Sequence, residues 1–171
     1  MIKKVSKVAL VSSSVMVLAL PFTAHEEGLR TAAYLDSVGV PTICYGETEG
    51  VKLGDKKTKQ ECDAMFYAKL GVFAFAVDAE INHTMTPNFH AAITSWAYNV
   101  GLGAVRKSTL IKKANAGDFI GACNELPKWK YAGGKPILAA RRERERQLCM
   151  KGIENAKVIP SAGSSYSSWN N

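Results

Sequence analysis

Residues 27–46, EGLRTAAYLDSVGVPTICYG, set the architecture of this 171-residue chain. The stretch opens on Glu27, directly after an apolar segment, and then becomes rich in glycine, β-branched and aromatic residues with turn signals. Residues 34–54 therefore predict a short β-hairpin or small sheet. Asp36 follows Glu27 by nine positions and Thr42 follows it by fifteen. The sequence thus places two carboxylates and a hydroxyl close together, on different elements.

Two carboxyl groups that face each other across a cleft are typical of glycoside hydrolysis. One is held protonated as general acid while the other stays ionised, and room for a water molecule between them gives inversion of configuration. The hydroxyl of Thr42 would orient that water. Spacing alone does not separate this arrangement from solvated surface charges, which any protein of this size carries.

The rest of the chain predicts helices. Thr58 and Glu61 form a capping box that opens a long helix to about Ile81, and Pro87 starts another through Val100. Further helices are expected over residues 107–115, 118–126 and 137–151, with a loop over 131–136. We therefore expect an α+β, mostly helical fold, in which a long helix joins a small N-terminal β-lobe to a larger C-terminal helical lobe.

Composition limits the chain to one globular domain with attachments. Hydrophobic residues make up 47% and charged residues 22%, which excludes disordered, collagen-like and multi-span membrane proteins. The net charge of +7 favours an anionic partner, such as nucleic acid, acidic lipid or a cell-wall polymer. The basic residues are spread along the chain and are not interleaved with aromatic residues on one element, so we do not expect nucleic acid.

The cysteines and histidines do not predict a metal site. The histidines share no ligand spacing and the cysteines form no CxxC pair, so we expect no metal and no cofactor. In an oxidising compartment four thiols allow three pairings. We favour Cys44 with Cys62, and Cys123 with Cys149, because each pair joins neighbouring elements. The alternative is that all four are small buried hydrophobic side chains.

The first 24 residues have the pattern of an export segment. Lys3, Lys4 and Lys7 precede an apolar run from Val8 to Leu20, in which three serines are the polar residues. A charged region followed by an apolar one is typical of a secretory signal. Residues 8–24 also reach the lower length limit for spanning a bilayer, so an uncleaved anchor is the second interpretation.

The two interpretations differ in what happens to the helix that carries Glu27. Cleavage after Ala24 would leave His25 as the new terminus and would remove the first turns of a helix that continues into residues 28–30. An uncleaved anchor would keep this helix whole. The three serines and Pro21 dilute the apolar run, so such a segment would sit in a membrane only weakly.

Several blocks of the chain resemble one known family. The catalytic segment of the bacteriophage lysozymes of glycoside hydrolase family 24 is similar to Glu27-Gly28-Leu29-Arg30, Tyr34, Asp36, Gly39, Thr42-Ile43 and Tyr45-Gly46. The later blocks of the lambdoid endolysin branch are similar to residues 96–101 and 108–110, and to Trp129 with residues 131–134 before Arg141-Arg142. The resemblance covers roughly residues 25–152.

The resemblance implies a function and a set of site residues. The family's catalytic pattern of Glu, eight residues, Asp, five residues, Thr falls on Glu27, Asp36 and Thr42. It implies a lysozyme-like fold with peptidoglycan in the cleft between the lobes, and a monomeric, inverting muramidase that serves host cell lysis and phage release. By position, the helical side of the cleft would be lined by Tyr98, Asn99 and Thr109, although each would equally suit ordinary helix packing.

The same resemblance implies a division of the chain into three parts. Residues 1–24 would be a signal-anchor-release or signal segment, 25–152 the catalytic domain and 153–171 a C-terminal tail. The first segment would hold the exported enzyme inactive at the host inner membrane until it leaves for the periplasm.

The chain departs from the family pattern at two positions. Many relatives have a histidine where this chain has Glu47, and the change would add a negative charge to the cleft wall and alter a local ion pair. Pro41 stiffens the strand before Thr42 and removes an amide donor.

Residues 141–146, RRERER, form a charge run on a helix, which typically faces water. We expect Arg142 and Arg146 to be the exceptions, because related lysozymes have a cation near the position of Glu27.

Two other functions fit part of the sequence. A lytic transglycosylase cuts the same polymer with one acidic residue and no water, which leaves Asp36 and Thr42 without a role. A non-catalytic basic module that binds the cell wall would explain the net charge alone.

Overall fold

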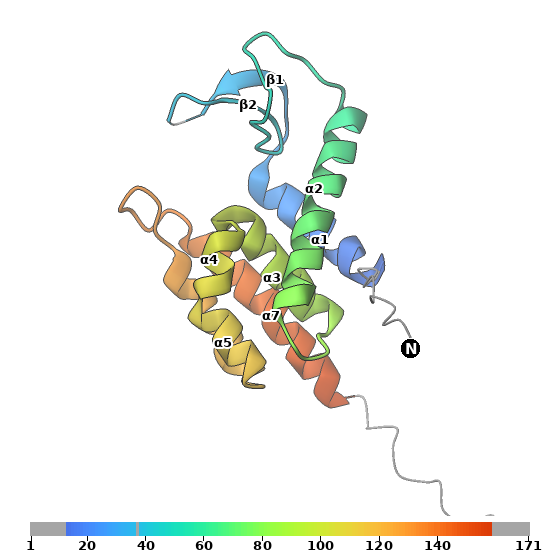
Figure 1. The fold of residues 1–171 in the computed structure, drawn as a ribbon, viewed down its shortest axis with the longest axis vertical. Coiled ribbons are helices and arrows are strands. Elements are labelled where there is room, and N and C mark those ends of the chain that lie inside the picture. Colours follow the sequence, from blue (N-terminus) through green and yellow to red (C-terminus); the bar gives the residue numbers. More distant parts are fainter. Residues whose placement is uncertain (1–12, 37, 159–171) are drawn as a thin grey trace, which may run out of the picture.

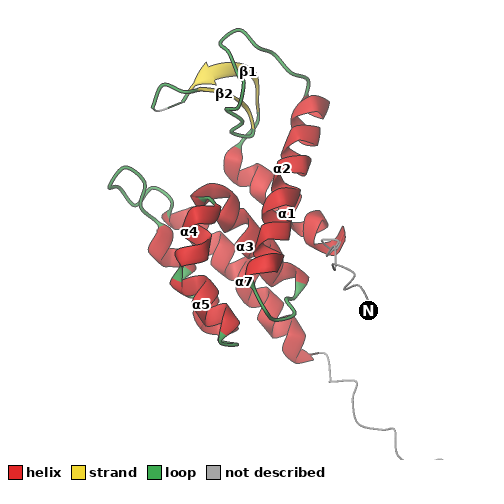
Figure 2. Cartoon of the chain, viewed as in Figure 1, coloured by secondary structure: helices red, strands yellow, loops and turns green. Residues whose placement is uncertain are grey.

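The computed structural model describes residues 13–36 and 38–158. The start of the expected export segment and the tail from residue 159 lie outside the described residues. Figures 1 and 2 show a β-lobe joined to a larger helical lobe by α2 (Lys59–Glu80), which confirms the expected fold class.

The β-lobe is a two-stranded antiparallel hairpin of β1 (Arg30–Leu35) and β2 (Pro41–Cys44), in which Tyr34 pairs with Thr42. The first strand begins earlier than expected. The helix before it, α1 (Ser13–Glu27), does not continue into residues 28–30, because Gly28 adopts a left-handed conformation with φ of +71°. Glycine reaches this region at no steric cost, so the chain turns directly from the helix into the strand.

The capping residues fix where the two long helices begin. The Thr58 hydroxyl accepts a hydrogen bond from the amide of Glu61, and the Glu61 carboxylate accepts one from the amide of Thr58, which confirms the capping box. The Thr86 hydroxyl caps α3 (Pro87–Val100) by accepting a hydrogen bond from the amide of Phe89, and Pro87 takes the first helical position. Both helices follow the bounds that the sequence predicts.

The remaining helices are shorter and more divided than expected. The structure has α4 (Leu102–Lys107), which the sequence analysis missed, and α5 (Thr109–Asn115), α6 (Phe119–Cys123) and a 3₁₀ turn, η1 (Leu126–Trp129). The break before α4 follows from Gly101, whose φ of +81° ends α3. The last helix, α7 (Ala139–Val158), extends beyond the expected residue 151.

The core places α3 at the centre of the helical lobe. Every residue from Phe89 to Ala97 is buried, and α7 and α1 both pack against this helix. Trp96 is fully buried beside Trp129, with ring centroids 5.2 Å apart. A helix that is buried on all sides has to be enclosed by other elements, and α1, α2 and α7 enclose this one.

The first helix is part of the same folded body. Val15, Met16 and Ala19 are buried in a second cluster that also contains Ile43 and Phe66, beneath the β-lobe. Among the described residues, no helix is both long and apolar enough to cross a membrane. The helix runs without interruption past Ala24, the last residue of the expected export segment.

Candidate active site

Glu27 is the last residue of α1, and its carboxyl group lies against the turn that follows β2. Its side chain is 17% exposed. A Cβ atom added to Gly46 would lie 3.8 Å from Glu27 Oε2, so the turn backbone passes close to the carboxyl group. Gly46 also has a φ of +87°. The positive φ favours glycine at this position, whereas the 3.8 Å distance is an ordinary contact that shows the carboxyl group lying beside the hairpin.

The cation beside Glu27 is Arg141. Its Nη2 atom lies 2.8 Å from Glu27 Oε1, and its side chain is 7% exposed. The expectation that Arg142 or Arg146 would fill this place is wrong. Arg142 turns instead to Asn99 and Glu145, and Arg146 pairs with Glu143 on its own helix.

Half of the charge run of α7 is turned into the protein, which corrects the expectation that most of it faces water. Arg141, Arg142 and Glu145 are all buried. The Glu145 carboxylate accepts hydrogen bonds from Arg141 Nε at 3.1 Å, Arg142 Nη1 at 2.5 Å and Ser95 Oγ at 3.0 Å. Burial raises the pKa of Glu145, and the two guanidinium groups oppose that rise. All three partners are donors, so the site fits a carboxylate rather than a protonated acid.

Glu26 is bound separately from its neighbour. Arg144 holds its carboxylate in a bidentate pair, with distances of 2.7 Å and 2.8 Å. The hydrogen bond from Arg144 is the main cause that lowers the pKa of Glu26 below its usual value. Glu26 and Glu27 therefore meet different cations of the same helix, and Glu26 is neutralised by an arginine that is partly exposed.

Asp36 and Thr42 are anchored to one turn of the hairpin. Asp36 Oδ1 accepts hydrogen bonds from the amides of Val38 and Val40, at 2.9 Å and 2.8 Å. The buried Thr42 hydroxyl donates to the carbonyl of Val40 at 2.9 Å. The structure thus brings Asp36 and Thr42 together, while β2 runs from their turn to the Gly46 turn beside Glu27.

The three residues expected on the helical side differ in their surroundings. The Tyr98 hydroxyl donates to the carbonyl of Tyr45 at 3.1 Å, and its ring contacts Phe66 and Phe73. Burial is the main cause that raises the pKa of Tyr98, with the negative charge of Glu27 adding to it. Asn99 is exposed and accepts a hydrogen bond from Arg142, and Thr109 is exposed at the start of α5. Tyr98 is therefore part of the contact between the lobes.

Glu47, one of the two departures from the family pattern, forms an ion pair with α2. Lys69 Nζ lies 2.8 Å from Glu47 Oε1, and the same ammonium group is 5.7 Å from the centroid of the Tyr98 ring. The negative charge that this residue adds is therefore compensated by a lysine of the connecting helix. Neither Lys69 nor its partnership with Glu47 was anticipated from the sequence.

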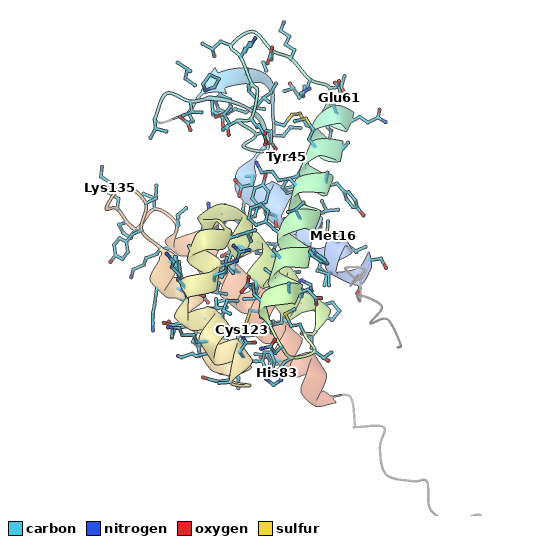
Figure 3. All side chains as sticks on the ribbon, in the orientation of Figure 1. Met16, Tyr45, Glu61, His83, Cys123 and Lys135 are labelled. Atoms are coloured by element: carbon cyan, nitrogen blue, oxygen red, sulfur yellow. A yellow bond between two sulfur atoms is a disulfide. The ribbon has the colours of Figure 1, made fainter. Side chains whose placement is uncertain are left out.

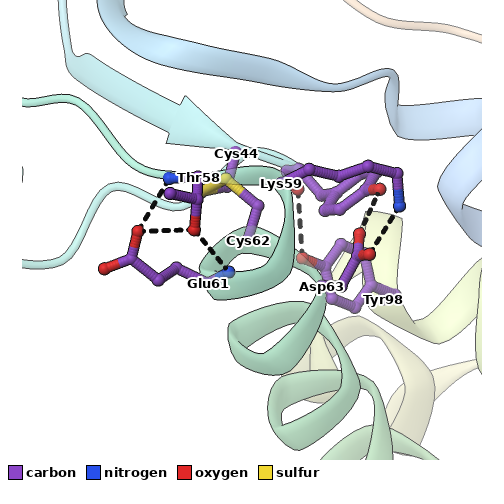
Figure 4. Close-up of a disulfide and its surroundings, with 8 residues drawn as sticks. Cys44, Thr58, Lys59, Glu61, Cys62, Asp63 and Tyr98 are labelled. Atoms are coloured by element: carbon purple, nitrogen blue, oxygen red, sulfur yellow. Dashed lines mark hydrogen bonds and ion pairs between the residues drawn. A yellow bond between two sulfur atoms is a disulfide. The ribbon is translucent and has the colours of Figure 1, made fainter.

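All four cysteines form disulfides, in the pairing favoured from the sequence. Cys44 is bonded to Cys62, with Cα atoms 5.0 Å apart, and Figure 4 shows this bond between the end of β2 and the first turn of α2. Cys123 is bonded to Cys149, which joins α6 to α7 at 5.8 Å. Cys44 has a φ of +59°, a conformation that a residue with a side chain rarely adopts. The first bond therefore fixes the hairpin at the position next to the Gly46 turn.

The Tyr45 side chain, which is labelled in Figure 3, lies against α2. Figure 4 shows Lys59 and Asp63 beside the disulfide, and Tyr45 donates to Asp63 at 2.8 Å. A cavity of about 480 Å³ between α1 and α2 is lined by Leu20, Pro21, Ala24, Tyr45, Lys59, Asp63, Ala64, Phe66 and Tyr67. None of the expected catalytic residues lines it, so we do not assign the reaction to this cavity. Within the described part of the chain, no group of His, Cys, Asp and Glu side chains has the arrangement of a metal site.

Comparisons with known proteins identify the family of this chain. Residues 24–145 match the Phage lysozyme family. The SAR-endolysin of Enterobacteria phage P21 is 39% identical over 147 residues, which cover 84% of this chain and 89% of the relative. The chain therefore belongs to the phage lysozyme family.

Two solved structures of one endolysin are informative as a pair. The active form of the P1 phage endolysin Lyz has a TM-score of 0.72 and 28% identity, and covers 85% of this chain and 88% of its own. The secreted inactive form of Lyz has a TM-score of 0.55 and 24% identity, and covers 84% of this chain and 97% of its own. The fold described here is more similar to the active form.

Proposed function

We propose that this phage lysozyme is an endolysin, a muramidase that hydrolyses the β-1,4 bond between N-acetylmuramic acid and N-acetylglucosamine in peptidoglycan. Family membership supports lysozyme activity. The observation that carries the residue assignment is the Glu27 carboxyl group, placed between the buried Arg141 and the Gly46 turn. Glu27 is the proposed general acid, and Asp36 and Thr42 are proposed to place the water.

The hydrogen bonds of Asp36 and Thr42 suit that role. Both amide contacts of Asp36 use Oδ1, so Oδ2 is the oxygen that would accept a proton from the attacking water. The Thr42 hydroxyl donates its proton to the carbonyl of Val40, so its oxygen would accept a hydrogen bond from the water. Two acceptors would then orient one water molecule for an inverting attack. After the Glu27 proton is transferred to the leaving oxygen, Arg141 would stabilise the carboxylate that forms.

We further propose that residues 1–24 act as a signal-anchor that is released without cleavage, and that the enzyme then works in the periplasm. The names of the P21 relative and of the similar endolysin of phage PA-2 support this release. In the fold described here, residues 13–24 belong to the helix that ends in Glu27, and several of them are buried against the protein. While this helix is held in the bilayer, it cannot pack against the rest of the protein. The tethered enzyme would therefore lack a positioned general acid.

Product analysis tests the proposed function. The purified chain is incubated with peptidoglycan, and lysis is followed by turbidity, reducing-end release and mass spectrometry of the fragments. Fragments that end in a reducing N-acetylmuramic acid are expected. Anhydro ends in place of reducing ends would show a lytic transglycosylase, and binding without cleavage would show a wall-binding module.

A further inference from the structure

Resting on the proposed function, we propose that Glu145 is a positioning residue of the lysozyme reaction. It fixes Arg141 against Glu27 and offsets the second buried cation, Arg142. Glu145 itself does not reach the substrate-facing side of the site, because its side chain is 0% exposed.

The contacts of Arg141 show how the position of the Glu27 carboxyl group depends on Glu145. Its Nε atom donates to Glu145 Oε1 at 3.1 Å, and its Nη2 atom donates to the carbonyl of Ser95 and lies 2.8 Å from Glu27 Oε1. A guanidinium group is planar and rigid, so fixing one nitrogen orients the others. Ser95 also donates its hydroxyl to Glu145 Oε1. The central helix α3 and Glu145 thus hold Arg141 from two sides.

The charges of this cluster balance only when Glu145 is included. Arg144 forms an ion pair with Glu26. The two remaining arginines, Arg141 and Arg142, pair with the carboxylates of Glu27 and Glu145. Arg142 is fully buried and donates to Glu145 and Asn99. Without Glu145, Arg141 would keep its ion pair with Glu27, but the buried Arg142 would lose its ion-pair partner. The carboxylate that still acts on Arg142 would be Glu26, which is already paired with Arg144, and a buried cation without a partner is costly.

This balance bears on the proton that Glu27 has to carry. Among the described residues, Arg141 of α7 pairs with Glu27, and the charges of both Glu27 and Glu47 act on the Tyr98 hydroxyl of α3. Removing Glu145 would leave the positive charge of Arg142 uncompensated beside Arg141, which pairs with Glu27. The protonated form of Glu27 would then be disfavoured, and proton donation would fail at a lower pH than in the natural protein.

The test compares Glu145→Gln with Glu143→Gln in the full chain. Both changes remove one negative charge from α7. Glu143, however, is partly exposed, and its ion pair is with Arg146 rather than with Arg141 or Arg142. For each folded variant, kcat and KM for reducing-end release from soluble peptidoglycan fragments are measured from pH 4 to 9. We expect Glu145→Gln to lower kcat at least tenfold with a smaller change in KM, and to move the alkaline limb of the profile to lower pH. Glu143→Gln should match the natural protein.

A second variant covers the case in which Glu145→Gln does not fold. Arg142→Gln combined with Glu145→Gln restores the charge balance but still removes the contact between Glu145 and Arg141. We expect this double variant to fold and to keep the natural alkaline limb, with kcat lowered severalfold. Natural kcat and natural pH dependence in a folded variant that lacks Glu145 would overturn the proposal. Absence of cleavage by the natural chain would instead overturn the proposed function, on which this inference rests.

Discussion

Arg141 Nη2 lies 2.8 Å from Glu27 Oε1, and this ion pair joins the end of the first described helix to the start of the last one. Because α1 enters the β-lobe at Glu27, the pair also connects the two lobes. The placement of the proposed general acid therefore depends on both α1 and α7 being packed in place.

Removing the Cys44–Cys62 disulfide should impair activity more than removing the Cys123–Cys149 disulfide. The first bond fixes the hairpin beside Glu27, while the second joins two helices of the helical lobe. Each double Cys→Ser variant should lose about 2–4 kcal/mol of unfolding free energy. Lysis per mole of folded protein should fall severalfold in the Cys44/Cys62 variant and little in the other. Equal specific activity in the two variants would show that the hairpin does not need its bond.

The ion pair between Glu47 and Lys69 should contribute a measurable coupling between the lobes. Its partners are 14% and 36% exposed, so a double-mutant cycle of Glu47→Gln and Lys69→Gln should give about 0.5–1 kcal/mol at low salt. The coupling should weaken at 1 M salt. The pair of Glu143 and Arg146, on one helix surface, serves as the comparison and should give about 0.3–0.5 kcal/mol. A coupling near zero for Glu47 and Lys69 would remove this pair from the interlobe contact.

The unfolding free energy should decrease as the pH falls below about 6.5, in part because of His90. This ring is buried in α3, with Nε2 2.9 Å from the carbonyl of Ala74, and burial lowers its pKa. A pKa lowered by folding means that stability is fully present above the unfolded value, about 6.5, and is lost as the pH falls and the ring must be protonated. Denaturant titrations at pH 7.5, 6.5 and 5.5 measure this dependence.

His90→Gln should flatten the pH dependence between pH 7.5 and 5.5, because glutamine does not titrate. The comparison variant is His83→Gln, which makes the same substitution at an exposed position. An unchanged slope in the His90 variant would assign the dependence to other groups.

A protein that begins at His25 should be unstable and poorly active, whereas one that begins at Ser13 should be active. The shorter chain lacks Val15 and Met16, whose burial contributes about 1.5–3 kcal/mol each, and only the last turn of α1 would carry Glu27. Thermal unfolding and lysis per mole of the two purified proteins give the answer. Full activity of the chain that begins at His25 would favour an ordinary cleaved signal peptide.

The sequence predicted the elements that depend on local signals. The capping box of Thr58 and Glu61, Pro87 at the start of α3 and the hairpin are readable because each rests on neighbouring residues. The breaks around α4 and α6 were missed, since short helices in a lobe are set by packing more than by propensity. The start of β1 was misplaced although Gly28 offered a signal, since a glycine directly after a helix commonly ends it.

The site was less accessible to sequence reasoning. The spacing of Glu27, Asp36 and Thr42 indicated candidates, and their roles stay predictions. Arg141 and Glu145 were missed, because a run of alternating charges looks the same whether it faces water or a neighbouring helix. The one available signal was their spacing of four residues, which puts both on one face of α7. Burial of such a pair depends on the partner helix α3, which the sequence does not place.

The central claim is that Glu27, and not its neighbour Glu26, is the general acid. The direct measurement is reducing-end release from peptidoglycan by Glu27→Gln and by Glu26→Gln, at equal concentrations of folded protein. Loss of proton donation should lower the rate of Glu27→Gln on the order of a hundredfold or more. Glu26→Gln removes the pair with Arg144 but leaves the pair of Glu27 with Arg141, so its effect should be far milder. Near-normal cleavage by folded Glu27→Gln would contradict the assignment.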